Sequence, residues 1–472
     1  MHVLLIWPRN LSTALNDDMS CCEPLPLEYL AGAIRDRHTV EIFDERLDES
    51  LDVWAQSHPV PDVVGVAIPY TISVPSSRRV SAWARDLWPQ AVIVLGGHHP
   101  TVTNRWMDGF AADWVIKGEG GALFSHLVDT LERHEEPLPL PGLARYGSVG
   151  VPLAIKSPQG QLQSTALPDR GIIDRHRPRY FHSTYRPVST IRFSAGCPHT
   201  CNFCSLWRLT GQRYLTKDTD RVLTELDQID SPNVYVVDDE AFIQPGRMRE
   251  LAEAIDGAGL DKRFHMYLRT DTALRNPDVI ERWAAIGLDS VLVGAESMSA
   301  SELDSYHKRT RPNQTRQAME LFHANAVKVR ANFLVDPVWS EEDFDQLERT
   351  VVDLNVDTPS FSVLTPLPGT DMFDQVQQEI LTNDPEMFDL YHSVLATNLP
   401  PGRFHERMAR LLAVAAGRSA DGSEAIFYFG DNHAFSRMLD NIRHRWDPRL
   451  VSCVRDRVAF SGFDQTTLWG SG

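Results

Sequence analysis

Cysteine is scarce in this chain, and what little there is lies unevenly. Six cysteines occur in 472 residues, and three of them, Cys197, Cys201 and Cys204, lie close together. This number excludes a scaffold stapled by disulfides, because domains of that type need a dense set of paired cysteines. Three clustered thiols in a chain otherwise poor in cysteine indicate a metal site.

Long hydrophobic runs and an excess of basic residues are also missing. No stretch approaches the ~20 apolar residues of a membrane span, and the opening MHVLLIWPRN reaches a charge too early for a signal peptide. We therefore expect a cytoplasmic protein without an integral membrane segment. The 46 lysines and arginines face 64 acidic residues, which gives a net charge of -18. Since this charge repels a polyanion, we expect no nucleic-acid partner.

The pattern of apolar residues predicts an α/β protein with several units. Residues 1–140 alternate short apolar runs with helical periods, which predicts a doubly wound, Rossmann-like parallel sheet. Residues 141–187 are rich in proline and glycine and are expected to form a linker. Residues 188–395 resume the alternation in about six strand–helix units, typical of a partial (βα)6 barrel. Residues 396–472 are expected to form a small, mainly helical region.

The three clustered cysteines follow a predicted strand in STIRFSAGCPHTCNFCSLW, with the spacing CxxxCxxC. A four-iron cluster normally takes four cysteines, so three ligands leave one iron open to another ligand. Structural zinc is the alternative, and it needs a fourth ligand, for which His199 inside the loop is a candidate.

The cysteine spacing, with Phe203 before the third cysteine, resembles the radical S-adenosylmethionine (SAM) superfamily. The resemblance implies a [4Fe–4S] cluster on Cys197, Cys201 and Cys204 whose open iron is chelated by SAM. Electron transfer from the cluster then cleaves SAM to a 5′-deoxyadenosyl radical. VVDDEAF, YLRTD and GAES stand in the order of the family's strand ends, and by this resemblance the SAM pocket is lined by Phe203, Asp239, Arg269, Glu296 and Ser297.

The first 140 residues resemble the cobalamin-binding domain found in one large class of these enzymes. The resemblance rests on PLPLEYLAGAIRD, VLGGHHPT and KGEGG, whose glycines allow the backbone to approach a bulky corrin. The DxHxxG motif that supplies a histidine to cobalt is absent, and Tyr70 and Thr71 are the candidates for lining the lower face of the corrin. The expected cobalamin contacts are Tyr70, Thr71, Gly96, Gly97, His98, Gly118, Glu119 and Gly120.

Later segments are similar to a subgroup that contains hopanoid C-3 methylases and natural-product methylases. The similarity lies in NFLVDPVWSEEDF, VLTPLPGTDMF and DLYHSVLATNLPPGRF. The segment HSVLATNLP departs from the pattern of that subgroup, so the resemblance does not transfer a substrate.

These resemblances imply a cobalamin-dependent radical SAM C-methyltransferase. The expected partners are a small-molecule or lipid-like substrate held between the two domains and an electron donor such as a flavodoxin or ferredoxin. A ring-forming, ring-contracting or other rearrangement without methylation is the first alternative, and a non-catalytic cobalamin or cluster sensor is the second. A tRNA methylthiotransferase shares the cysteine loop but carries further N-terminal cysteines and a basic tail.

Some remaining residues are expected to be structural. Cys21, Cys22 and Cys453 are interpreted as packing residues. Tyr306, His307 and Lys308 follow the fourth barrel strand and could reach the site between the domains, but we interpret them as a solvated helix start.

Overall fold

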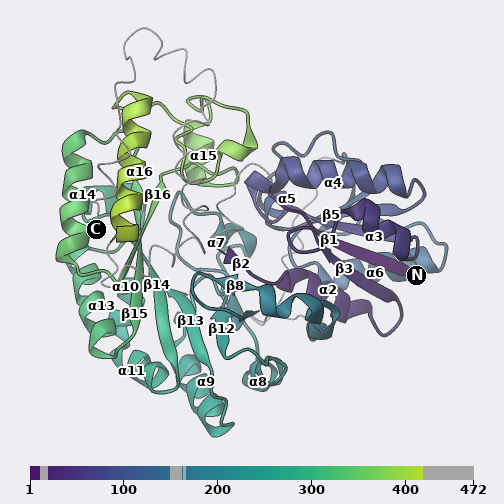
Figure 1. Cartoon of the computed structure of the whole chain (residues 1–472), viewed down its shortest axis with the longest axis horizontal. Coiled ribbons are helices and arrows are strands. Elements are labelled where there is room, and N and C mark those ends of the chain that lie inside the picture. Colours follow the sequence, from purple (N-terminus) through teal and green to yellow (C-terminus); the bar gives the residue numbers. More distant parts are fainter. Residues whose placement is uncertain (11–19, 149–161, 163–165, 418–472) are drawn as a thin grey trace, which may run out of the picture.

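Two six-stranded sheets, one from each half of the chain, make up the protein (Figure 1). The structure is a computed structural model that describes residues 1–10, 20–148, 162 and 166–417. The first sheet has the order β3-β1-β4-β5-β6-β7 and the second has the order β16-β15-β14-β13-β12-β9. The predicted α/β class is confirmed, and the doubly wound domain and the six-stranded partial barrel both appear.

The first sheet is parallel except at one edge, where β7 runs antiparallel to β6. Its apolar strands are buried on both faces, because adjacent residues of β1 such as Leu4 and Leu5 enter two different hydrophobic clusters. Helices α2 and α6 cover one face, and α3 and α4 cover the other. The elements are β1 (His2–Trp7), α2 (Leu25–Ile34), β3 (Thr39–Asp44), α3 (Leu51–Ser57), β4 (Val63–Ala67), η1 (Thr71–Ser73), α4 (Val74–Leu87), β5 (Val92–Gly96), α5 (His98–Val102), β6 (Trp114–Ile116), α6 (Gly121–Glu132) and β7 (Leu143–Arg145).

The segment expected to be a linker contains ordered elements. Besides β7 it contributes η2 (Arg170–Arg179) and β8 (Phe181–His182). Strand β8 pairs antiparallel with β2 (Ser20–Cys21), a short strand from the first domain. The sequence analysis missed this two-stranded ribbon, because strands of two residues carry no periodic signal.

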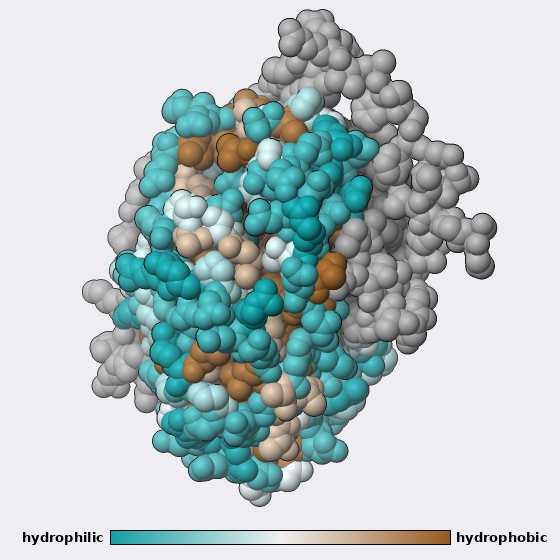
Figure 2. All heavy atoms as spheres, turned by 90° about the vertical axis from the view of Figure 1, so that its left-hand side faces the viewer, coloured by the Kyte–Doolittle hydropathy of each residue, from teal (hydrophilic) through white to brown (hydrophobic). Residues whose placement is uncertain are grey.

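The second sheet consists of six parallel strands with helices on its outer face. Each amphipathic helix buries one stripe of apolar residues; in α14, for example, this stripe is Phe344, Leu347 and Val351. The outward surface of these helices is mainly hydrophilic, with hydrophobic residues scattered over it (Figure 2). The strands are β9 (Val188–Ile191), β12 (Asn233–Val236), β13 (Arg263–Leu268), β14 (Leu288–Glu296), β15 (Lys328–Val335) and β16 (Thr358–Val363). The helices are α8 (Thr219–Asp227), α9 (Pro245–Gly257), α10 (Thr270–Arg275), α11 (Pro277–Ala285), α12 (Ala300–Ser305), α13 (Pro312–Ala324) and α14 (Glu341–Asp353).

Short elements complete the barrel end that faces the first domain. They are β10 (Ser194–Ala195), α7 (Leu206–Leu209), β11 (Leu215–Thr216), α15 (Asp371–Val376) and η3 (Pro385–Met387). The last described element is α16 (Pro401–Gly417), while the rest of the expected C-terminal region, including Cys453, lies outside the described residues. Across the part of the chain that the structure describes, no helix combines the length and apolar character needed to cross a bilayer.

Buried polar contacts join the two domains. The Tyr29 hydroxyl of α2 accepts a hydrogen bond from Lys217 Nζ at 2.5 Å and donates one to Glu225 Oε2 of α8 at 2.6 Å. Lys217 also forms an ion pair with Glu225 at 2.7 Å. Because each of these buried polar groups has a partner in this network, the interface holds one defined arrangement of the domains.

The barrel core centres on Trp283, which is completely buried. Its ring lies within 5.4–6.2 Å of the rings of Phe193, Phe242 and Phe264, and its Nε1 donates a hydrogen bond to the Met248 carbonyl at 2.9 Å. We expect Trp283→Ala to lower the free energy of unfolding by about 3–5 kcal/mol, through lost burial and the cavity left behind. Urea unfolding followed by circular dichroism measures the loss. Val352→Ala, at a residue that is 55% exposed, is the matched control, and equal losses in the two variants would contradict the assignment of Trp283 to the core.

Candidate active site

The three clustered cysteines lie on a loop between β10 and α7, at the carboxyl end of the barrel strands. Gly196 starts this loop with a φ of +86°, and a Cβ there would lie 2.1 Å from the Arg213 carbonyl oxygen, so the turn requires glycine. Cys201 is buried, Cys197 and Cys204 are partly buried, and all three are free thiols. Neighbouring elements hold the loop: the Asn202 side chain donates a hydrogen bond to the Ser305 carbonyl at 2.9 Å.

The three thiols influence one another electrostatically. Burial, with a smaller contribution from Cys201, raises the pKa of Cys197 to about 11 and that of Cys204 to about 12. Metal binding must therefore displace protons from these thiols. Arg269 Nη1 lies 3.8 Å from Cys201 Sγ, so a positive group stands beside the developing thiolate.

The donor set fits a multi-iron cluster better than a single ion. Within the described ranges, no three histidine, cysteine, aspartate or glutamate side chains converge on one metal position. A structural zinc site needs four ligands on one ion. Each cysteine of a four-iron cluster instead binds a different iron, so the sulfurs do not need to converge. The arrangement fits the expected [4Fe–4S] cluster, with Cys197, Cys201 and Cys204 as its ligands.

Two of the expected SAM residues are buried beside the cysteine loop. Arg269 donates hydrogen bonds to Asp271 Oδ1 at 2.9 Å and to the Lys308 carbonyl at 2.6 Å. Glu296 ends β14 with a φ of +59° and forms a buried ion pair with Lys308 Nζ at 2.7 Å. Gly294 makes room for this pair, because a Cβ there would lie 2.2 Å from Glu296 Oε1.

The interpretation of the segment after β14 as a solvated helix start is wrong for two of its three residues. Tyr306 is 2% exposed and Lys308 is 6% exposed, whereas His307 is exposed. The sequence analysis missed Lys308 because its partner, Glu296, lies 12 residues away on the preceding strand, and pairs at this distance leave no local pattern.

Three acidic residues after β12 take different positions. Asp238 accepts hydrogen bonds from the Phe193 backbone and the Ser194 hydroxyl, and Asp239 accepts one from the Gly196 backbone at 2.7 Å. Both carboxylates thus hold the cysteine loop. Glu240 is 1% exposed, and its Oε1 has no hydrogen-bond partner among the described residues. Burial raises the pKa of Glu240 to about 7.

Glu240 is the functional candidate that the sequence analysis missed. A buried carboxylate oxygen without a partner is costly, and the ammonium group of SAM is a suitable partner for it. The signal in the sequence was a third acidic residue directly after Asp239 at a strand end. The other two expected SAM residues make protein contacts: Ser297 hydrogen-bonds Glu302, and the Phe203 ring packs edge-on against Tyr306 at 6.0 Å.

The glycines of the first domain line the carboxyl ends of β5 and β6. Gly97 has a φ of +125°, and a Cβ there would lie 2.6 Å from the Ile68 carbonyl oxygen. Gly118 has a φ of +83°, and Gly120 caps helix α6. At Gly121 a Cβ would meet no atom within 4 Å, and at Gly96 it would make only ordinary contacts. This open space beside glycine backbone fits a bulky corrin.

His98 joins the two sets of site residues. It follows Gly97 at the start of α5, and its Nε2 shares a hydrogen bond of 2.9 Å with the Ser205 hydroxyl, next to Cys204. Burial lowers the pKa of His98 to about 4, so the ring is neutral at physiological pH. The neighbouring His99 shares a hydrogen bond of 3.2 Å with the Thr71 hydroxyl. The glycine-lined strand ends therefore face the cysteine loop.

Glu119 and Tyr70 are two further expected cobalamin contacts. Arg192 donates two hydrogen bonds to the Glu119 carboxylate, at 2.8 and 3.0 Å. Burial raises the pKa of Glu119, but the charge of Arg192 outweighs this effect and the net pKa is lowered. Tyr70 is 54% exposed, so its ring is accessible to a ligand.

Comparison with known protein families places each domain. Residues 191–351 match the Radical SAM superfamily, and residues 14–128 match the B12 binding domain. The cofactors expected from the sequence, a [4Fe–4S] cluster, SAM and cobalamin, are confirmed by these matches and by the solved structure described next.

The full-length comparisons agree. The chain is 30% identical over 399 residues to hopanoid C-3 methylase of Methylococcus capsulatus, covering 82% of this chain and 75% of that protein. It is 25% identical over 430 residues to the anaerobic magnesium-protoporphyrin IX monomethyl ester cyclase of Rubrivivax gelatinosus, covering 84% and 73%. The fold is similar to that of the radical SAM methyltransferase TsrM from Kitasatospora setae, solved with cobalamin and a [4Fe–4S] cluster, with a TM-score of 0.67, 17% identity and 90% of each chain covered.

The expected contact between the Glu240 carboxylate and SAM can be tested by substitution. We expect Glu240→Gln to weaken SAM binding about tenfold or more, because a charge-assisted hydrogen bond contributes about 1.5–3 kcal/mol. Equilibrium dialysis of labelled SAM against the cluster-reconstituted protein measures the dissociation constant, and iron content checks that the cluster is retained. Glu253→Gln, at an exposed position of α9, is the matched control. Wild-type affinity in Glu240→Gln would rule out this contact.

Proposed function

The chain belongs to the cobalamin-dependent radical SAM family that includes hopanoid C-3 methylase, and we propose that it methylates an unactivated carbon of a small molecule bound between its two domains. The observation that carries the proposal is the contact between His98 and Ser205, which sets the glycine-lined strand ends opposite the cysteine loop. Because β7 pairs with β6, we place the end of the cobalamin domain at Arg145 instead of residue 140.

The cofactors supply the difficult chemistry: when bound, the cluster and SAM provide hydrogen abstraction from carbon, and cobalamin provides the methyl group. The protein supplies position and shielding. Cys197, Cys201 and Cys204 hold the cluster, with Arg269 beside Cys201. Glu240 and the Glu296–Lys308 pair present buried charges toward SAM.

The expected cobalamin contacts all come from the first domain, on the side that faces the cysteine loop. Gly96, Gly97, Gly118 and Gly120 let the corrin approach the backbone, and Tyr70 and Thr71 lie where its lower face would rest. The bidentate contact between Arg192 and Glu119 links the two domains at an accessible position, since the Glu119 side chain is 56% exposed.

The cluster must also receive electrons. Pro198 is exposed and Thr200 is partly exposed, so the outer edge of the cysteine loop reaches the protein surface. This accessibility supports a one-electron donor protein, such as a flavodoxin or ferredoxin, docking at this edge, in the cytoplasm that the composition favours.

Methyl transfer is tested with SAM labelled in its methyl group. We expect the anaerobically reconstituted chain, given hydroxocobalamin, a strong reductant and a small-molecule extract of its source cells, to form 5′-deoxyadenosine and S-adenosylhomocysteine together and to label a product carbon. Cys201→Ala should form no 5′-deoxyadenosine, because the cluster loses a ligand. A rearrangement would instead give 5′-deoxyadenosine without label transfer. Inactivity equal to that of Cys201→Ala would support a sensor.

Cobalamin binding is tested separately. Since a side chain at Gly121 would enter the open space beside the strand ends, we expect Gly121→Leu to reduce bound cobalamin at least tenfold while iron content stays unchanged. Gly257→Leu is the matched control, because a Cβ at this α9 position also meets no atom within 4 Å. Corrin absorption after gel filtration measures retention. Equal retention in both variants would place the corrin elsewhere.

A further inference from the structure

The inward face of the barrel strands is unusually polar. Alternate residues of β14, β15 and β16 face either the helices or the lumen, because side chains of a strand alternate between its two faces. The residues that pack against the helices are apolar and fully buried, for example Val291, Val329 and Phe361. The residues on the opposite face are Ser290, Leu292, Gly294, Arg330, Asn332, Thr358, Ser360 and Ser362.

The lumen is also hollow. These eight residues keep part of their surface accessible, whereas the apolar outward residues between them do not. Of the two other β15 residues on the inward face, Lys328 is exposed and Leu334 is buried. A barrel whose interior serves only as a core is filled by bulky apolar side chains. A lumen lined by hydroxyl and amide groups with accessible surface suits a hydrophilic molecule instead.

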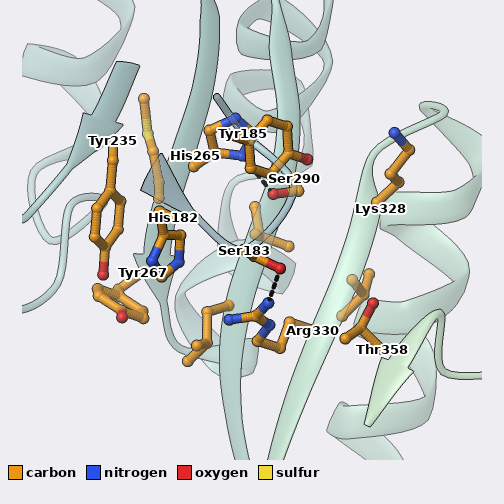
Figure 3. A pocket seen from close by; sticks show the side chains of 14 residues that line it. His182, Ser183, Tyr185, Tyr235, His265, Tyr267, Ser290, Lys328, Arg330 and Thr358 are labelled. Atoms are coloured by element: carbon orange, nitrogen blue, oxygen red, sulfur yellow. Dashed lines mark hydrogen bonds between the residues drawn. The ribbon is translucent and has the colours of Figure 1, made fainter. Parts of the chain in front are cut away.

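The β8 ribbon forms the floor of this lumen. A cavity of about 40 Å³ lies at the amino-terminal ends of the barrel strands, and His182, Ser183 and Tyr185 from the ribbon line it together with residues of β12 to β16 (Figure 3). The His182 ring stacks on Tyr235 at 4.3 Å, and its Nδ1 shares a hydrogen bond of 3.0 Å with the Ser20 hydroxyl of β2. A cavity of this size holds a few water molecules or one small polar group.

His265 points to a ligand in this cavity. Its side chain is on β13 and the residue is only 3% exposed. Nδ1 shares a hydrogen bond of 2.6 Å with the Ser290 hydroxyl, but Nε2 has no hydrogen-bond partner in the described chain. A buried polar atom left in this state costs about 1–3 kcal/mol, so the site is complete only when something polar occupies the cavity.

The charged residues that line the cavity indicate which chemical group it would bind. Lys328 and Arg330 line it, and no aspartate or glutamate does. Arg330 lies beside His182 and donates a hydrogen bond to the Ser183 hydroxyl at 2.8 Å, while Lys328 stands apart, 3.6 Å from Asp289 (Figure 3). A guanidinium next to an imidazole nitrogen, in a lining without carboxylates, matches a carboxylate or phosphate group.

The floor and the cysteine loop lie at opposite ends of one strand face. His265, Tyr267 and Arg269 alternate along β13 and its end, so they lie on the same side of the strand. The four residue steps from His265 to Arg269 span ~13 Å at the usual rise of a β-strand. Tyr267 lies between them on the same face of the strand.

We propose that the barrel lumen is the substrate pocket and that it takes a hydrophilic small molecule with a carboxylate or phosphate group. The anionic end binds at Arg330, His265 Nε2 hydrogen-bonds another polar group of the same molecule, and the reacting carbon lies near the cysteine loop and the corrin. This inference rests on the proposed methyl transfer and names its substrate class. A hydrocarbon lipid does not suit this lumen, because it would leave His265 Nε2 without a hydrogen bond and the charge of Arg330 without water around it.

The experiment supplies methyl-labelled SAM to the holoenzyme with a cell extract divided into three fractions: compounds retained by an anion exchanger, polar compounds that pass through, and solvent-extracted lipids. We expect label in a product of the retained fraction. Arg330→Gln should lower kcat/KM for that fraction about tenfold or more, mainly through KM, because it removes a charge-assisted hydrogen bond. Arg330→Lys should restore part of the loss.

Arg263→Gln is the matched control, because Arg263 also carries a positive charge at the floor end of β13 but is exposed. Iron and corrin content show that each variant is folded. His265→Phe tests the second contact and should also raise KM for the retained fraction. Label confined to the lipid or pass-through fraction, or wild-type kinetics in Arg330→Gln, would overturn the inference while leaving methyl transfer intact. A wild-type enzyme that transfers no label would instead overturn the proposed function and this inference with it.

Discussion

The positioning of the cysteine loop is the constraint on which the rest of the structure depends. Neighbouring strand ends hold the loop. Asp239 accepts a hydrogen bond from the Gly196 backbone where the loop starts, and Asp238 binds Phe193 and Ser194 just before it. Arg269, after β13, approaches Cys201. The carboxylates of Asp238 and Asp239 are therefore occupied by hydrogen bonds from the protein. The carboxylate left for a ligand is Glu240, one residue further along, which explains why the position next to the expected one has the unpaired oxygen.

The same loop also sets the relation of the two domains. Ser205 follows Cys204 directly and contacts His98 of the first domain, while Arg192, the first residue after β9, contacts Glu119. A change in the packing of the domains therefore moves the corrin wall and the cluster wall together. The buried Tyr29–Lys217–Glu225 network makes such a change costly, since parting the domains would leave buried polar groups without partners.

The sequence predicted the features that have a local signal. Apolar runs such as HVLLIW located the strands, and the spacing of Cys197, Cys201 and Cys204 located the metal loop, because both patterns lie within a few residues. Features formed by residues far apart were missed. Lys308 was interpreted as solvated although it pairs with Glu296, and the β2–β8 ribbon pairs Ser20 with His182 and Cys21 with Phe181, residues 162 and 160 positions apart. Tertiary contacts decide such positions, and no periodicity records them.

The alternation of polar and apolar residues along the barrel strands nevertheless indicates the substrate class, and it can be interpreted once the barrel fold is known. In β15 the outward residues Val329, Ala331 and Phe333 are apolar, and the inward residues Arg330 and Asn332 are polar. A strand buried on both sides in a packed core has no use for this alternation, since each buried polar side chain costs free energy unless it is hydrogen-bonded. Asn332 accepts a hydrogen bond from the Ser362 hydroxyl and Arg330 donates one to Ser183, and the surface that these side chains keep accessible suits a wet or occupied lumen. The chain carries a net charge of -18, yet the floor of its lumen is lined by Arg330 and Lys328 without an acid, so its overall charge repels anions while one internal position attracts them.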